Sequence, residues 1–301
     1  MTEARWRVSV VGPGGVGGLI GAVLTRAGHP VQFVARPETA AVLNADGLDV
    51  SSAEFGEFHV PASARPHLTG PVDLCVVTVK ANSLAPALAA VPADAVADGL
   101  VLPLLNGVEH MAVLRAHFPA AQVVAGAIRV ESTRVSPGRI EHTSPFCWTE
   151  VASDTAPRDR VEALAGQLRE AGLDVTVRED ETTLLWDKLV LLAPLALLTT
   201  HAGAPAGMVR DQRRADLDAV AAEIATVARA AGARVDLAAV LTMYDRVPAG
   251  FKSSMQRDAE AGRSTELDAI GGAVLRTGRR VGVATPVTAR LVDELRQRLS
   301  A

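Results

Sequence analysis

The chain has 301 residues, of which 49% are hydrophobic and 21% are charged, and its formal net charge at pH 7 is −4. This length is enough for two domains that each bury a core, and the composition is too apolar for a disordered chain. The negative net charge argues against a nucleic-acid partner held through its phosphates.

The chain shows no sign of a membrane segment, a signal sequence or a metal motif. Its longest apolar run is Leu189–Leu198, ten residues, about half of what a membrane span needs. The N-terminus enters a strand-like run directly and has no apolar signal core. The two cysteines, Cys75 and Cys147, lie too far apart for a metal motif or a disulfide framework. We therefore expect a cytoplasmic protein without a bound metal.

The first half of the chain alternates between strand-like and helical runs. Residues 5–36 form a predicted βαβ unit with strands at 7–11 and 31–35 and a helix at 19–28. The further strand-like runs are 72–79, 99–105, 123–130 and 174–177, and the helical runs are 83–91, 109–118 and 158–171. This alternation implies a parallel sheet. Residues 131–150, with a turn at Pro137-Gly138, are typical of an antiparallel hairpin.

From about residue 179 the pattern is helical to the end, with helices predicted at 181–198, 214–232 and 265–282. Pro194 predicts a kink in the first of them. Thr285 before Pro286 is typical of a helix N-cap followed by proline at the first helical position. The chain thus predicts an α/β domain at residues 1–178 and an all-α domain at residues 179–301.

A glycine-rich turn lies inside the predicted βαβ unit. Its residues Gly12, Pro13, Gly14, Gly15, Val16 and Gly17 match the pattern GxGxxG between a strand and a helix. Such glycines let the chain turn tightly and let a pyrophosphate approach backbone amides at a helix N-terminus. The pattern predicts a Rossmann-type dinucleotide site; the alternative is a glycine-rich turn without a ligand.

The end of the second predicted strand bears on the choice of dinucleotide. NAD-specific folds usually place Asp or Glu there, on the ribose hydroxyls, whereas this chain has Arg36 and no acid until Glu38. An arginine suits a 2′-phosphate, so the sequence favours NADPH over NADH. The alternative is a solvated arginine at a strand end.

Lysine is rare in this chain: 27 of the 30 basic residues are arginine, and the lysines are Lys80, Lys188 and Lys252. A lysine kept against such a bias indicates a position that needs a compact, titratable ammonium. Chance retention on the surface is the alternative for each of them. Asparagine is equally rare, and none follows Asn106.

With these residues in view, the chain resembles the ketopantoate reductase (2-dehydropantoate 2-reductase) family over nearly its full length. The matching stretches are the Gly12–Gly17 loop, GHPVQFVAR ending at Arg36, VTVKA around Lys80, LLNGVE around Asn106, LLWDKL around Lys188, and SSMQRD…STELD from Ser253 to Asp268. The resemblance implies a Rossmann domain followed by a helical domain, and an NADPH-dependent enzyme of pantothenate biosynthesis that acts on a small 2-oxo acid. A homodimer through the helical domain is implied by the resemblance alone.

The resemblance also implies roles for residues of the first half. Arg36 and Lys80 would help to hold NADPH, and Asn106 would lie where the nicotinamide and the substrate meet. Lys80 and Asn106 each follow a predicted parallel strand directly, at the edge of the sheet where such folds bind ligands.

In the helical half, the resemblance makes Lys188 the proton donor to the substrate's carbonyl oxygen as hydride reaches the carbon. Ser254 matches a ligand of the substrate carboxylate, and Glu266 a residue near the lysine, the substrate and the cofactor ribose. An ammonium on a leucine-rich helix face is unfavourable unless it is paired or faces a cleft. The alternatives are a lysine that extends from a core helix to solvent, a serine between helices, and a glutamate favoured by a helix dipole.

The match fails at the positions where the family carries substrate-binding asparagines. Those positions fall at Leu192, Ala196 and about Ala206. A wall that cannot hydrogen-bond the substrate's hydroxyls loses discrimination for them. A more apolar 2-oxo acid, ketone or imine is therefore an alternative substrate, and a non-catalytic NADPH sensor is an alternative function.

Overall fold

The computed structural model describes residues 5–300, and the chain folds into two compact units. The first unit runs to Leu105 and resumes from His110 to Leu184. The second consists of Asn106–Glu109 and the chain from Leu185 onward. The last division falls inside helix α6 (Glu181–Ala202), which begins shortly after the predicted boundary at residue 178.

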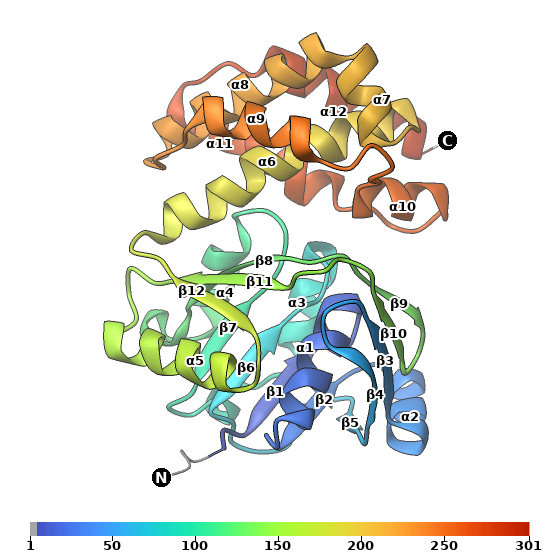
Figure 1. Ribbon diagram of the computed structural model, residues 1–301. Helices are drawn as coiled ribbons and strands as arrows, with labels where there is room; N and C mark the ends of the chain where they lie inside the picture. The colour runs from blue at the N-terminus through green and yellow to red at the C-terminus, as the bar shows by residue number, and fades with distance from the viewer. Residues whose placement is uncertain (1–4, 301) are drawn as a thin grey trace. The chain divides into compact units, whose positions relative to one another are not determined.

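A parallel five-stranded sheet forms the centre of the first unit (Figure 1). In spatial order its strands are β5 (Ser63–Arg65), β2 (Val31–Val34), β1 (Val8–Val11), β6 (Leu74–Val77) and β7 (Leu100–Pro103). The inner strands β1 and β6 are buried along their whole length, as is usual in a parallel sheet, and so is β7 at the edge of this sheet. The chain builds outward from β1 on one side and then returns to β6 on the other, so the strand order reverses between β1 and β6. The predicted α/β Rossmann-type fold with a parallel sheet is confirmed.

Helix α1 (Gly15–Arg26) packs against this sheet and against a second one. The second sheet contains, in order, β4 (Gly56–Val60), β3 (Leu48–Ser52), β10 (Arg139–His142) and β9 (Ser132–Ser136). A Cβ on Gly18 would overlap Ile140 of β10, and one on Gly21 would overlap the ring of Phe33 in β2. The absence of a side chain at Gly18 and Gly21, one helical turn apart, therefore allows β10 and β2 to approach α1 closely.

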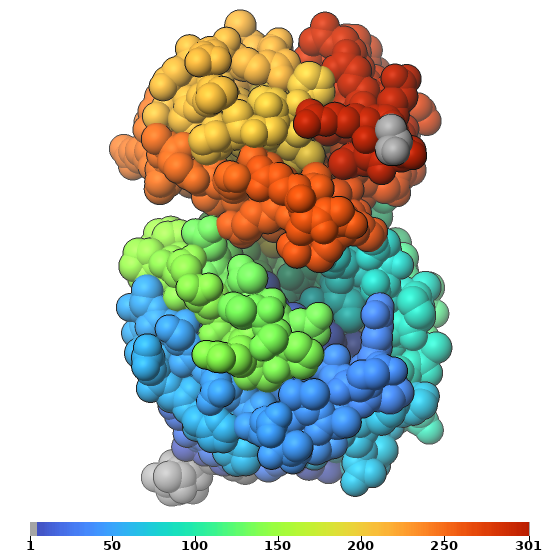
Figure 2. Space-filling model, turned by 90° about the vertical axis from the view of Figure 1, so that its right-hand side faces the viewer, coloured from blue at the N-terminus to red at the C-terminus, as the bar shows by residue number. Residues whose placement is uncertain are grey.

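The predicted antiparallel hairpin is confirmed for β9 and β10, which flank Pro137-Gly138. In Figure 2 the green residues of this hairpin lie at the surface beside the blue segment that contains β3 and β4, and β10 pairs with β3. The remaining helices of the first unit are α2 (Pro37–Asp46), α3 (Leu84–Leu88), α4 (His110–His117) and α5 (Arg158–Glu170). Helix α2 and strands β3 to β5 lie in a stretch for which the sequence pattern predicted no element.

The run at residues 123–130 does not extend the parallel sheet, and that prediction was wrong. Only Val123 forms an isolated parallel bridge, with Val101. The strand itself, β8 (Ala125–Arg129), joins a third sheet in which it pairs antiparallel with β11 (Trp148–Ala152), next to β12 (Asp174–Val177). The reason is the hairpin that follows β8: without a helical crossover the chain returns in the opposite direction, and an antiparallel partner is nearest.

The second unit is helical, as predicted (Figure 1). It has its own apolar core. Besides α6, its α-helices are α7 (Ala206–Gln212), α8 (Arg214–Ala230), α9 (Leu237–Arg246), α10 (Ser254–Glu260), α11 (Ala273–Val281) and α12 (Pro286–Leu299). A short π-helix, η4 (Asp268–Gly272), runs directly into α11. Gly282 ends α11 in a left-handed conformation, as its place at the end of the predicted helix suggested.

The start of α12 is capped differently from the prediction. Thr285 occupies the N-cap position, but its side chain makes no capping hydrogen bond. The carboxylate of Glu223 in α8 instead accepts hydrogen bonds from the backbone N–H groups of Val287 and Thr288, both at 2.8 Å. A carboxylate also suits the positive end of the helix dipole, so α8 and α12 are joined by this cap.

Helix α6 is long and apolar enough, by length and composition, to cross a membrane, but 72% of its most apolar window is buried inside the fold. Pro194 lies inside this helix and has no N–H to donate to the carbonyl of Val190, four residues earlier. The hydroxyl of the buried Tyr244, in α9, donates to that carbonyl at 2.9 Å. The chain's single tyrosine thus satisfies the acceptor that Pro194 leaves open.

We expect Tyr244→Phe to lower the free energy of unfolding by about 1–3 kcal/mol, because a buried carbonyl loses its partner. Urea denaturation measures this difference. In a Pro194→Ala background residue 194 regains an N–H for Val190, so the same substitution should have a smaller effect. An equal loss in both backgrounds would contradict this account of Tyr244.

Candidate functional site

The glycine-rich loop connects β1 to α1 and turns sharply at Gly12, whose φ is +88°. The N–H of Gly14 donates to the carbonyl of Gly12 at 2.7 Å, which closes the turn. Gly14 is the N-cap residue of α1, and no side chain caps this helix start. The first N–H groups of α1, near Gly15 and Val16, can therefore serve an anion at the positive end of the helix dipole.

The glycines of this loop differ in what a side chain would meet. A Cβ on Gly17 would overlap Thr78 Oγ1 and the Gly12 carbonyl, and one on Gly15 would overlap the backbone of Ser132. At Gly14 the nearest atom to an added Cβ is the Gly12 carbonyl oxygen, at 4.0 Å. Gly15 and Gly17 are thus needed by the protein's own packing, whereas Gly14 borders open space. This geometry fits a loop whose backbone a phosphate approaches at Gly14.

Two hydroxyl groups that the sequence reasoning missed hold this loop. Thr78 Oγ1 lies within hydrogen-bonding distance of the carbonyls of Val11 (3.0 Å) and Gly12 (2.8 Å). Ser132 Oγ donates to the carbonyl of Gly15 at 2.8 Å. Thr78 could have been found as a polar residue at the carboxyl end of a buried strand. Ser132 gave no such signal, because its role depends on where the β9–β10 hairpin folds.

Arg36 and Lys80 lie on either side of the glycine loop along one edge of the parallel sheet. Arg36 follows β2, is exposed and precedes α2 as its N-cap residue, while Lys80 follows β6 and is half-buried. Because β2, β1 and β6 are neighbours, these two cations and the loop after β1 occupy three adjacent strand ends. Two strand spacings span roughly 10 Å. This edge includes the reversal of strand order between β1 and β6, where open α/β sheets bind ligands.

In the second unit the structure brings Asn106 and Glu266 together. Asn106 Nδ2 donates to Glu266 Oε2 at 2.9 Å, although 160 positions separate the two residues. Asn106 follows β7 in the chain, but its contacts place it with the helical unit. Both side chains are half-buried, and Glu266 stands just before η4.

Lys188 and Ser254 stand on separate helices, α6 and α10. Lys188 is half-buried on a helix whose neighbouring residues are largely leucine, as expected. Ser254 is exposed at the first position of α10, whereas Ser253 before it is buried. Ser253 caps α10 and shares a 2.9 Å hydrogen bond with Thr199 Oγ1 of α6. Ser253 is therefore the serine that holds α10 in place through hydrogen bonds, whereas the side chain of Ser254 is accessible from solvent.

The three positions that would carry substrate-binding asparagines are apolar and largely closed off. Leu192 is half-buried against the helical core, and Ala196 and Ala206 are buried in it. Among residues 5–300, no group of three or more His, Cys, Asp or Glu side chains is arranged to hold a metal ion.

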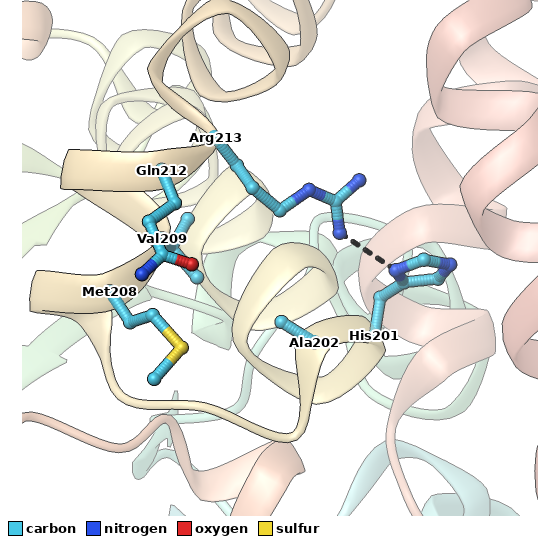
Figure 3. A pocket seen from close by; sticks show the side chains of 6 residues that line it. All are labelled: His201, Ala202, Met208, Val209, Gln212 and Arg213. Atoms are coloured by element: carbon cyan, nitrogen blue, oxygen red, sulfur yellow. Dashed lines mark hydrogen bonds between the residues drawn. The ribbon is translucent and has the colours of Figure 1, made fainter.

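A pocket of about 300 Å³ opens at the other end of α6, and none of the predicted site residues lines it (Figure 3). In this pocket Arg213 donates a hydrogen bond to His201 Nδ1 at 2.8 Å. At 1.5 Å per residue, His201 lies roughly 20 Å along the helix from Lys188. The pocket is therefore distinct from the candidate site. Its lining residues are His201, Ala202, Met208, Val209, Gln212 and Arg213.

Comparison with known proteins gives matches over both units. The family model "Ketopantoate reductase PanE/ApbA" matches residues 8–152, and the model for the C-terminal part of that family matches residues 181–299. An uncharacterized oxidoreductase of Bacillus subtilis, YkpB, is 31% identical over 92% of this chain and 94% of its own length. A 2-dehydropantoate 2-reductase of Mycobacterium tuberculosis is 30% identical over 96% of each chain.

Solved structures agree with these matches. A PanE/ApbA family ketopantoate reductase from Ralstonia eutropha superposes with a TM-score of 0.88 at 27% identity, over 98% of both chains. A D-mandelate dehydrogenase in complex with NADH has the same TM-score at 21% identity, over 98% of both chains, which shows a common fold.

The two kinds of glycine in the loop can be separated by substitution. We expect Gly17→Ala to lower the melting temperature, because the added methyl overlaps Thr78 and Gly12 and such overpacking costs about 1–3 kcal/mol. We expect Gly14→Ala to keep the melting temperature but to weaken dinucleotide binding at least about tenfold, because its methyl occupies the open side of the loop. Thermal unfolding and a fluorescence titration measure the two effects. Wild-type binding by Gly14→Ala would rule out a phosphate at this position.

Proposed function

The chain belongs to the ketopantoate reductase family, and we propose that it is an NADPH-dependent reductase of a small 2-oxo acid. The observation that carries this proposal is the 2.9 Å hydrogen bond between Asn106 and Glu266. It joins two of the predicted site residues in the unit that also holds Lys188 and Ser254. A protein that only sensed NADPH would need neither a proton donor nor a carboxylate ligand, so these residues favour an enzyme over a sensor.

The domain at residues 1–178 would bind the cofactor. The N–H groups at the start of α1 and the open side of Gly14 suit the pyrophosphate, and Lys80 adds positive charge at the neighbouring strand end. Arg36 would pair with the 2′-phosphate, for which a guanidinium fork is well suited. When bound, NADPH supplies the hydride that reduces the carbonyl carbon.

The domain at residues 179–301 would bind and protonate the substrate. The hydroxyl of Ser254 would hold the carboxylate. The ammonium of Lys188 would donate a proton to the carbonyl oxygen, so that the oxo group becomes a hydroxyl, and the neutral amine would then regain a proton from solvent. The leucines around Lys188 would limit the access of water, and Asn106 and Glu266 would orient the reacting groups beside it.

The apolar residues at 192, 196 and 206 favour a second candidate substrate class. Ketopantoate carries a hydroxyl group, and Leu192, Ala196 and Ala206 offer no side-chain hydrogen bond to it. A more apolar 2-oxo acid, ketone or imine would leave fewer polar groups unsatisfied in such a site. A role in pantothenate biosynthesis holds only if ketopantoate itself is the substrate.

A cytoplasmic location and a homodimer formed through the helical domain are part of the same proposal and rest on family membership. The net charge of −4 supports a small-molecule substrate over a nucleic-acid partner.

Lys188→Ala tests the chemical step. We expect kcat to fall by at least about 100-fold, the usual contribution of a general acid, while affinity for NADPH stays within about twofold. Lys252→Ala is the matched control, because Lys252 pairs with Glu260 at 2.9 Å and is not part of the proposed site. Unchanged turnover by Lys188→Ala would remove the proposed mechanism.

The assay for this comparison is NADPH consumption with a panel of 2-oxo acids and ketones that includes ketopantoate. A higher kcat/KM for apolar 2-oxo acids would assign the second substrate class, and the highest kcat/KM for ketopantoate would exclude it.

Substitutions of Arg36 test whether the protein prefers NADPH to NADH. A fluorescence titration should give tighter binding of NADPH than of NADH, and Arg36→Ala should weaken NADPH about tenfold or more while leaving NADH unaffected, because only NADPH carries the 2′-phosphate. Arg36→Lys should fall between the two, since it keeps the charge but loses the fork. Equal affinity of the wild-type protein for both dinucleotides would contradict the role of Arg36.

A further inference from the structure

The loop Asn106–Glu109 belongs to the helical unit by its contacts, although the chain on both sides of it belongs to the first unit. Strand β7 precedes it and helix α4 follows it. Contacts with the helical unit must therefore fix its position, since the loop contains no regular secondary structure of its own.

The guanidinium of Arg276 contacts both this loop and the π-helix η4. Arg276, in α11, donates from Nε and Nη2 to the two carboxylate oxygens of Glu109, at 2.9 and 2.7 Å. The same group donates from Nη1 to Asp268 Oδ1 at 2.9 Å and from Nη2 to the Asp268 carbonyl at 3.0 Å. Arg276 thus links the loop to the first residue of η4, and it holds Glu109 through a two-pronged ion pair, a geometry that fixes orientation better than a single hydrogen bond does.

The backbones of the two segments also touch. Gly107 has a φ of +87°, and a Cβ there would lie 2.5 Å from the carbonyl oxygen of Ala269. Three contacts therefore join the two segments: Asn106 with Glu266, Gly107 with Ala269, and Glu109 through Arg276 with Asp268. All three hold the same four-residue loop against residues 266–269, so they constrain the position of the loop together.

The π-helix makes this arrangement possible at Asp268. Its carbonyl accepts the N–H of Ala273, five residues later, and the Nη2 group of Arg276 as well. The hydrogen bond from Arg276 also lowers the pKa of the Asp268 carboxyl below its ordinary value, so this ion pair is formed at neutral pH. Single π-turns of this kind occur frequently at functional sites.

We propose that Arg276 is a positioning residue for the reduction, which fixes the loop Asn106–Glu109 on η4 and thereby sets the Asn106–Glu266 pair. This inference rests on the proposed function. The side chains of Arg276 and Glu109 are 42% and 44% exposed, and ion pairs this exposed contribute little to stability. Loss of the link should therefore change turnover more than it changes folding.

Arg276→Gln tests this role against Arg214→Gln as a matched control. Arg214 lies in the same unit, has a side chain that is 38% exposed, and also pairs with two carboxylates, those of Asp218 and Asp245. We expect Arg276→Gln to lower kcat about tenfold, because small misplacements of positioning groups slow catalysis strongly. Its affinity for NADPH and its melting temperature should match those of Arg214→Gln, which should keep the wild-type kcat. Arg276→Lys should recover part of the loss, since one ammonium can hold only one of the two carboxylates well.

Glu109→Gln provides a second route to the same link. If both residues act through one ion pair, the double variant should lose no more turnover than Arg276→Gln alone. Hydrogen–deuterium exchange of the peptide around Asn106–Glu109 should be faster in both single variants than in wild type or Arg214→Gln.

Wild-type kcat in Arg276→Gln would overturn the positioning role even if exchange of the loop increases, and wild-type exchange would overturn the link itself. An equal loss of kcat in Arg214→Gln would reduce Arg276 to a structural residue. The exchange measurement needs no substrate. If the wild-type protein reduces no 2-oxo acid, the proposed function fails, while exchange still decides whether Arg276 holds the loop.

Discussion

The hydrogen bond between Asn106 and Glu266 is the interaction on which the proposed helical half of the site depends. A half-buried carboxylate and a half-buried amide are both unfavourable without a partner, and each supplies what the other lacks. Asn106 and Glu266 lie 160 positions apart in the chain, and this bond holds them together within the helical unit. Gly107 lies against Ala269, and Arg276 binds Glu109, so two further contacts hold the same loop in the helical unit beside this bond.

The glycine loop of the first unit shows a different constraint. Its pattern GxGxxG is a single feature in the sequence, yet the structure divides it into glycines that the fold needs and one that borders open space. The division depends on Thr78 and Ser132, which lie far from the loop in sequence. The motif could therefore locate the loop but could not tell which glycine a ligand would approach.

The same limit explains which parts of the fold were predictable. The βαβ unit, helix α5, strand β12 and the end of α11 at Gly282 follow from local periodicity and turn chemistry, and the structure agrees with them. The partner of β8 could not be predicted, because it depends on the hairpin that follows. The cap of α12 by Glu223 and the hydrogen bond from Tyr244 to Val190 could not be predicted for a related reason. They join residues that are 64 and 54 positions apart in the chain, and a local sequence pattern contains no information on such pairs.

The three lysines of this chain show that the rarity of a residue type does not by itself identify a functional residue. Of the three lysines, Lys252 forms an ordinary ion pair with Glu260, in which its side chain is 43% exposed and an arginine would serve equally well. Rarity alone is thus no sign of function. What separates Lys80 and Lys188 from Lys252 is location: one stands at the end of a buried parallel strand and the other on the leucine-rich face of a core helix. At both places the ammonium is partly buried, which is unfavourable unless a polar or charged group compensates for it. In the proposed function the place of each lysine matters more than its rarity: Lys80 lies at the strand end beside the glycine loop, where a dinucleotide would bind, and Lys188 lies in the helical unit with Ser254 and Glu266.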